Sequence, residues 1–123
     1  MSLSVVNEFL RAAAARDYDT ALALVSEDVE YQNMMLPAVH GKAAMVETLE
    51  ALLALCSHSE WEVLREVAAG PLVMNERVDR FTLDGVTTAL PVAGVFELRD
   101  GLIAVWHDYF DLATIMAAMP VAG

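Results

Sequence analysis

The sequence feature that most restricts the fold is Asp84-Gly85, a dipeptide typical of the shortest β-hairpin turns. Segments rich in residues that favour β-structure lie on both sides of it, at 72–83 and 86–98. A two-residue turn fixes the register of two such strands, because facing residues are counted outward from the turn. We therefore expect a long antiparallel hairpin whose facing residues can be read from the sequence.

Counted outward from this turn, Arg77 faces Val92 and Asp79 faces Leu90. Residues two apart in a strand share a face, so Arg77 and Asp79 share theirs with apolar neighbours. One interpretation is an ordinary ion pair on an exposed strand. The apolar partners favour a buried ion pair instead, and because desolvation makes such a pair a weak source of stability, its retention suggests a function.

The next turn contains Asp100-Gly101 and leaves the register of the following strand open. A two-residue loop would pair Ala93 with Asp108, whereas a three-residue loop with only Gly101 in the left-handed conformation pairs Val92 with Asp108. The two registers place the Asp108 carboxyl group on opposite faces of the sheet.

We expect the three-residue loop, because it sets the small Gly94 against the large Trp106. In that register Asp108 shares a face with Arg77 and Asp79, about 10 Å from the arginine and within reach of its side chain. Two carboxyl groups beside one arginine in a dry pocket cannot both stay ionised, so one should hold a proton near neutral pH. Such an acid–base pair suits the addition of water to a strained electrophile. A surface position at a strand end is the alternative for Asp108.

Hydrophobic spacing and turn residues outline the other elements. We expect helices over 4–16, 17–24, 42–56 and 112–119, the last ended by Pro120, and strands over 29–33, 59–68, 72–83, 86–98 and 102–111. Helices followed by an antiparallel meander predict one α+β domain over 1–123, with helices packed on one face of a strongly curved sheet. A cone of this shape encloses a deep apolar pocket.

Composition supports a cavity or a subunit interface. Apolar residues make up 57% of the 123 residues, above the usual share, and so small a domain cannot bury them all in one core. The formal net charge of −11, from 7 basic and 18 acidic residues, excludes a cationic surface for nucleic acid and disfavours binding to an anionic membrane.

Targeting and redox features favour a cytoplasmic protein. The first residues lack the basic and apolar regions of a signal peptide, and no apolar run reaches about 18 residues, so we expect no membrane span. Cys56 is the single cysteine, which rules out an intramolecular disulfide and is compatible with a reducing compartment. It more readily fills a helix face than acts as a nucleophile.

Motifs for metal ions and common cofactors are missing from the sequence. His40, His58 and His107 are scattered and do not have the spacing of a metal site. No nucleophile elbow, dinucleotide fingerprint or P-loop occurs. We therefore expect neither a metal nor a cofactor. Tyr31 and Asn33 share one strand face and could serve only as hydrogen-bonding residues of the core.

Three short motifs, YQNMMLP, ERVD and WHDYFD, occur in this order across most of the chain. Together they make the chain resemble the limonene-1,2-epoxide hydrolase family, within the wider nuclear-transport-factor-2-like, or SnoaL-like, cone fold. The resemblance implies hydrolysis of an epoxide to a vicinal diol in one step, without a covalent intermediate or a cofactor. It also implies a homodimer.

The same resemblance implies a role for five residues. Tyr31 and Asn33 would hold the attacking water, and Asp108 would take a proton from it. Arg77 would bridge the two carboxyl groups, and Asp79 would protonate the epoxide oxygen.

Two other readings stay open. One is a steroid-isomerase-like or polyketide-cyclase-like enzyme, which would use one carboxylate base with neutral donors. The other is a non-catalytic module for ligand binding or dimerisation, because a fold alone does not determine function. The arginine between two aspartates disfavours both. The expected pocket residues are apolar and favour a lipophilic epoxide, without indicating which one. They are Leu52, Cys56, Leu90, Val92, Phe110 and Ile115.

Overall fold

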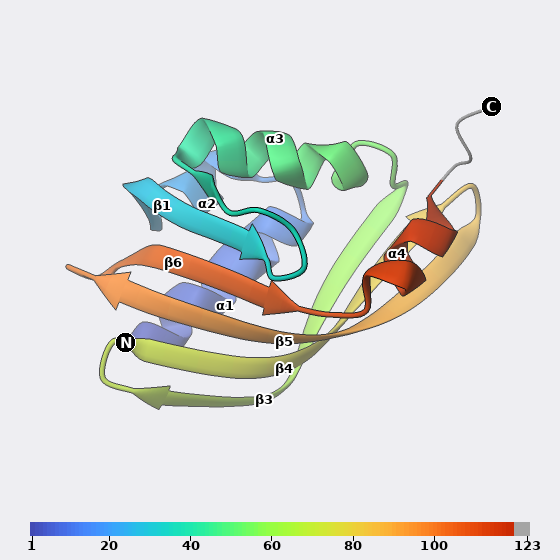
Figure 1. Ribbon diagram of the computed structural model, residues 1–123. Coiled ribbons are helices and arrows are strands. Elements are labelled where there is room, and N and C mark those ends of the chain that lie inside the picture. The colour runs from blue at the N-terminus through green and yellow to red at the C-terminus, as the bar shows by residue number, and fades with distance from the viewer. Residues whose placement is uncertain (120–123) are drawn as a thin grey trace.

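The computed structural model describes residues 1–119 and shows one curved sheet with helices on its concave side (Figure 1). The strand order is β2-β1-β6-β5-β4-β3, in which β1 and β6 run parallel and the other neighbours antiparallel. The helices are α1 (Ser2–Ala14), α2 (Tyr18–Leu22), α3 (Lys42–Leu53) and α4 (Leu112–Ala118). The strands are β1 (Val25–Asn33), β2 (Val39–His40), β3 (His58–Ala69), β4 (Leu72–Leu83), β5 (Val86–Arg99) and β6 (Leu102–Tyr109). The expected α+β class and curved sheet are confirmed.

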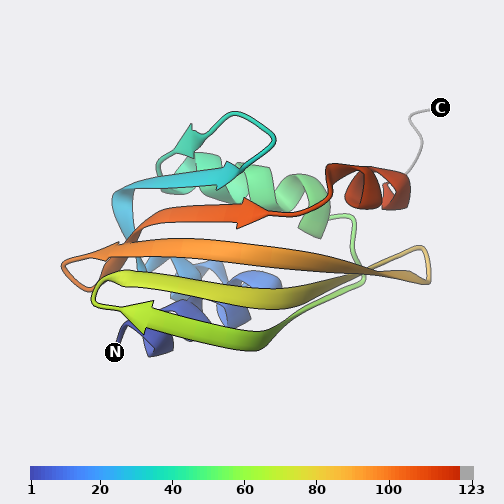
Figure 2. The same cartoon turned by 60° about the horizontal axis from the view of Figure 1, so that its bottom comes forward.

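Helix α1 fills the concave side of the sheet with its apolar stripe. Val6, Phe9, Leu10 and Ala13 recur at helical spacing, and all four are buried. The Phe9 ring meets the Trp106 ring edge to face, with centroids 5.0 Å apart. Helix α3 lies over β1, so the two helices cover different parts of one face (Figures 1 and 2).

Element boundaries differ from the expectation where local signals are weak. Strand β1 begins at Val25, before the expected start at 29, and the two-residue strand β2 was not expected. Asp17 is the N-cap of α2, since its carboxylate accepts a hydrogen bond from the Thr20 amide at 3.3 Å. Pro120, the expected end of the last helix, lies outside the described residues.

The first hairpin has the predicted register. Leu83 pairs with Val86. Both turn residues, Asp84 and Gly85, have positive φ angles of 49° and 78°, as a two-residue turn with the twist of the flanking strands requires. Further along the hairpin, Arg77 therefore lies opposite Val92.

The second hairpin corrects the predicted loop. Asp100 and Gly101 both have positive φ, at 54° and 77°, so the turn has two residues rather than three. A β-bulge at Ala104, which has no partner in β5, then shifts the register by one residue. The bulge places Asp108 opposite Gly94 rather than Val92. Asp108 nevertheless lies on the predicted face of the sheet, the one that carries Arg77 and Asp79.

No helix within residues 1–119 is both long and apolar enough to cross a membrane.

Candidate active site

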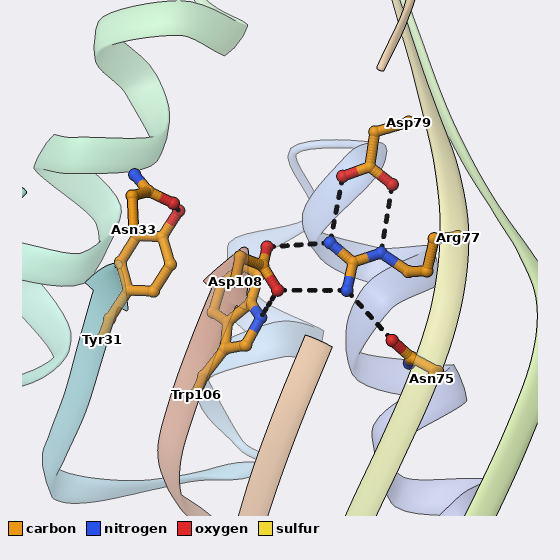
Figure 3. Close-up of polar contacts among 7 residues, drawn as sticks. All are labelled: Tyr31, Asn33, Asn75, Arg77, Asp79, Trp106 and Asp108. Carbon is orange, nitrogen blue, oxygen red and sulfur yellow. Dashed lines mark hydrogen bonds and ion pairs between the residues drawn. The ribbon is translucent and has the colours of Figure 1, made fainter. Parts of the chain in front are cut away.

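The centre of the site is Arg77, whose side chain is fully buried in the middle of β4. Its Nε and Nη2 donate to the two carboxylate oxygens of Asp79, both at 3.0 Å. Its Nη1 and Nη2 donate to the two oxygens of Asp108 at 3.1 and 2.8 Å. Nη1 also donates to Asn75 Oδ1 at 3.2 Å (Figure 3). Each of the five guanidinium N–H groups thus has an acceptor, so the arginine is rigidly held.

Local strand geometry explains how these groups meet. Asn75, Arg77 and Asp79 are two residues apart in β4, so their side chains share the concave face. Asp108 lies on β6, two strands away, opposite Gly94 of β5. The guanidinium crosses the intervening strand to reach it, as the sequence predicted for a long side chain.

Gly94 leaves the space for that crossing. A Cβ atom at this position would lie 2.5 Å from Arg77 Nη1 and 2.7 Å from Asn75 Oδ1, closer than such atoms approach. The sequence interpretation matched Gly94 with Trp106, which is wrong, because Trp106 pairs with Phe96. Sequence reasoning missed Asn75, and it recognised Gly94 as a space-making residue but gave it the wrong neighbour.

Trp106 holds the Asp108 carboxyl group from the other side. Its indole Nε1 donates to Asp108 Oδ1 at 2.8 Å, so three N–H groups in all converge on this carboxylate. Tyr31 stacks on the Trp106 ring with centroids 4.2 Å apart. The stacking holds the Trp106 ring, and the hydrogen bond from that ring holds the Asp108 carboxyl group at the cavity.

Tyr31 and Asn33 reach the same cavity from β1. The parallel pairing sets Tyr31 beside Trp106 and Asn33 beside Asp108. The Tyr31 hydroxyl donates to Asn33 Oδ1 at 3.1 Å. Among the described residues, the Asn33 amide N–H groups make no side-chain hydrogen bond, so they and the Tyr31 oxygen can hold a small polar molecule beside Asp108. The five expected catalytic residues therefore come together in space (Figure 3).

Burial and neighbouring charges shift the pKa values of three groups in the site. Burial raises the pKa of Asp79 to about 6, and the charge and hydrogen bonds of Arg77 only partly offset it. Burial would lower the pKa of Arg77, but the charges of Asp108 and Asp79 outweigh burial and raise it. Burial, then the charge of Asp108, raises the pKa of Tyr31, which keeps its hydroxyl neutral. Asp79 is thus an acid that can hold its proton near neutral pH.

The cavity has a volume of about 80 Å³, and Tyr31, Asn33, Asp79 and Asp108 form its polar wall. Four of the six expected apolar residues line it, namely Leu52, Leu90, Phe110 and Ile115. The rest of the wall consists of Thr48, Leu49, Leu53, Trp61, Phe81 and Trp106.

Two expected pocket residues do not line the cavity. Val92 is 4% exposed, packs in the core opposite Arg77 and is absent from the cavity wall. Helix α3 ends at Leu53, so Cys56 follows the helix instead of continuing its face. Cys56 lies near a separate surface hollow with Ala14 and Ser57.

A metal site has no support in the described part of the chain. Within residues 1–119, no three or more histidine, cysteine, aspartate or glutamate side chains are arranged to hold a metal ion. The carboxyl groups of the site are instead occupied by Arg77.

The chain matches one family model and several known proteins in sequence or structure. The family model of the limonene-1,2-epoxide hydrolase catalytic domain matches residues 1–121. Epoxide hydrolase EphG of Mycobacterium tuberculosis is 32% identical over 107 residues, which cover 87% of this chain and 71% of that protein. The structure of an M. tuberculosis LEH-like epoxide hydrolase matches with a TM-score of 0.81 and 29% identity, covering 94% of this chain and 86% of the other.

Other solved structures share the fold at lower identity. A SnoaL-like protein from Shewanella putrefaciens has a TM-score of 0.85 at 16% identity, over 94% of this chain and 93% of that one. An NTF2-like protein from Burkholderia pseudomallei has a TM-score of 0.83 at 18% identity, over 94% and 95%. These two likenesses show the fold alone.

Proposed function

The chain belongs to the limonene-1,2-epoxide hydrolase family, and from this premise we propose that it hydrolyses a lipophilic epoxide to a vicinal diol in one step. The observation that carries the proposal is the pair of carboxyl groups held by one buried arginine at the wall of an apolar cavity. Asp79 is the acid, and Asp108 is the base.

On the base side, a water molecule held by Tyr31 and Asn33 gives a proton to Asp108 as its oxygen attacks an epoxide carbon. Asp108 accepts hydrogen bonds from Arg77 and Trp106, and a carboxylate anion accepts such bonds better than a carboxylic acid does. These contacts aim Asp108 before substrate arrives, which lowers the cost of reaching the transition state.

On the acid side, Asp79 donates its proton to the epoxide oxygen as the carbon–oxygen bond opens. The pKa of about 6 keeps a protonated fraction available near neutral pH. The carboxylate that remains is stabilised by the two hydrogen bonds from Arg77. The cycle closes when a proton returns from Asp108 to Asp79, both of which contact the same guanidinium.

Direct attack by water is favoured over a covalent ester. Epoxide hydrolases of the α/β-hydrolase type form an ester with an aspartate and release it with a water that a histidine activates. His40 and His107 contact Glu30, and His58 contacts Glu60. None of the three histidines lines the cavity.

A single turnover in ¹⁸O-labelled water tests this mechanism. The label should appear in the diol and be missing from every peptide of the protein, as read by mass spectrometry. Label in a peptide that contains Asp79 or Asp108 would establish a covalent ester and refute the one-step mechanism. Absence of diol with every epoxide of a size-graded panel would refute the hydrolase proposal itself and favour a non-catalytic binding module.

An isomerase-like or cyclase-like activity has less support. Such an enzyme needs one carboxylate base and neutral donors, and it has no use for an arginine that occupies two carboxyl groups. Trp106 and Asn75 complete the arginine–carboxylate network. Such a network suits a reaction in which two proton transfers are coupled.

A homodimer is the second part of the proposal. The convex face of the sheet carries no helix within residues 1–119 (Figure 2). Exposed apolar side chains gather there, with Val67 at 61%, Met74 at 47% and Tyr109 at 47% exposure beside the exposed Pro91 and Ala93. A second copy of the chain would cover this face. Sedimentation velocity should give the dimer mass, and Met74→Asp should shift it to the monomer. A cytoplasmic location stays a prediction.

A further inference from the structure

The cavity is small for a family named after a bulky terpene epoxide. Its volume of about 80 Å³ compares with roughly 300–1,000 Å³ for common ligand pockets. Two indole rings, Trp61 and Trp106, occupy part of the wall.

The two indoles differ in their polar contacts. Trp106 donates its N–H to Asp108 at 2.8 Å and is 1% exposed, so its place in the site is explained by the carboxylate that it holds. The Trp61 Nε1 is buried and has no hydrogen-bond partner among the described residues. An unpaired buried donor lowers stability, so Trp61 is not retained for a hydrogen bond that holds the fold.

The position of Trp61 places its ring beside the reacting groups. Trp61 of β3 pairs with Asp79 of β4, so the two side chains are neighbours on the concave face. Its ring centroid lies 5.9 Å from Arg77 Cζ, 6.4 Å from the Phe81 centroid and 6.2 Å from the Trp106 centroid. A large ring packed between the acid and the aromatic wall takes up space that a substrate would otherwise use.

We propose that Trp61 is the specificity-determining residue that limits this enzyme to compact epoxides. Substrates such as 2,3-epoxybutane and cyclopentene oxide fit beside it, whereas limonene 1,2-oxide and stilbene oxide do not. The inference rests on the proposed hydrolase function and names the substrate class of that same cavity. Trp61 touches the substrate but transfers no proton.

The test compares kcat/KM for the two compact and the two bulky epoxides in the parent, Trp61→Phe and Trp61→Val. The parent should prefer the compact pair. Trp61→Val should raise kcat/KM for the bulky pair by about 10–200-fold, the range that a single methylene group is worth in an apolar pocket, with Trp61→Phe in between. Val63→Ala is the matched control, because Val63 shares the strand and the face but lies outside the cavity. It should leave the preference unchanged.

A parent that hydrolyses limonene oxide as well as epoxybutane, or a Trp61→Val variant with the parent's preference, overturns the size limit. Diol binding by titration calorimetry keeps this test separate from the hydrolase proposal. Limonene-1,2-diol should bind Trp61→Val at least about tenfold more tightly than it binds the parent, while butane-2,3-diol should show no such gain. Equal gains for both diols overturn the inference even if no variant turns over any epoxide. Circular dichroism confirms that each variant is folded before it is measured.

Discussion

Two arginine–carboxylate pairs lie on opposite faces of the sheet, and they differ most in how far water reaches them. On the convex face, Arg65 donates from Nε and Nη2 to Glu76 at 2.8 and 3.0 Å, with side chains 81% and 48% exposed. On the concave face, Arg77 donates from the same two atoms to Asp79 at 3.0 Å each, with side chains 0% and 6% exposed.

The pKa values of the two carboxyl groups shift in opposite directions. The hydrogen bond from Arg65 lowers the pKa of Glu76. Burial raises the pKa of Asp79 to about 6, although its arginine is as close. An arginine thus stabilises a carboxylate anion where water also does so, whereas in a buried cavity the loss of water outweighs the arginine. Two carboxyl groups that each accept two hydrogen bonds from an arginine can therefore differ in the direction of their pKa shift.

The largest expected difference between the faces is in turnover. Asp79→Asn and Asp108→Asn should each lower kcat by about 10²–10⁴, because each removes one end of a proton transfer. The double variant should lose far less than the product of the two effects, since the residues act as a unit. Glu76→Gln is the control and should keep the parent rate. Diol formation under saturating epoxide measures all four, and an Asp108→Asn variant with near-parental kcat would remove Asp108 from the mechanism.

The second largest expected difference is in the free energy of unfolding after each arginine is replaced by alanine. Arg77→Ala leaves two buried carboxyl groups without their counter-charge and should lose about 3–5 kcal/mol of unfolding free energy. Arg65→Ala, on the wet face, should leave the urea midpoint close to that of the parent. Urea unfolding followed by tryptophan fluorescence gives both values. Equal midpoints for the two variants would mean that water reaches the Arg77 cluster.

Gly94→Ala perturbs the buried pair without changing any charge. The added methyl group would meet Arg77 Nη1 and Asn75 Oδ1, so the guanidinium must move away from Asp108. We expect a loss of about 1–3 kcal/mol in stability together with a lower kcat. Ala89→Ser, on the convex face of the same strand, controls for a change in β5. A Gly94→Ala variant with parental stability and rate would show that the cluster tolerates a different arginine position.

The pH dependence should differ in sign between the two faces. The pKa of Asp79 is raised in the folded protein, so its contribution to stability is present below its ordinary value near 3.8 and is lost as pH rises through about 6. The pKa of Glu76 is lowered, so its contribution is present above its ordinary value near 4.5 and is lost as pH falls.

Urea unfolding between pH 4 and pH 7 should therefore show the parent losing stability relative to Asp79→Asn as pH rises. Relative to Glu76→Gln, the parent should lose stability as pH falls. The rate should also decline above about pH 6, where Asp79 gives up its proton. A difference between the parent and Asp79→Asn that stays constant with pH would place the titration of Asp79 outside this range.

Local sequence determined the frame of the site. Asp84-Gly85 set the register of β4 and β5, because two residues that tolerate positive φ allow one tight turn there. The two-residue period of a strand then placed Arg77 and Asp79 on one face. Both results depend on neighbours in the chain, which is why they could be read without a structure.

Tertiary structure decided what the sequence left open. The bulge at Ala104, and not the expected loop, brought Asp108 opposite Gly94. The two-residue turn at Asp100-Gly101 alone would place Asp108 on the convex face, and the one unpaired residue in β6 returns it to the concave face. The end of α3 at Leu53 took Cys56 out of the cavity, and the pairing of β3 with β4 brought Trp61 into it. Whether an arginine–carboxylate pair is exposed to solvent or buried depends on which elements, distant in the sequence, cover it. Burial depends on the whole fold, so the pKa of Asp79 is raised only once the helices and the sheet have closed around it.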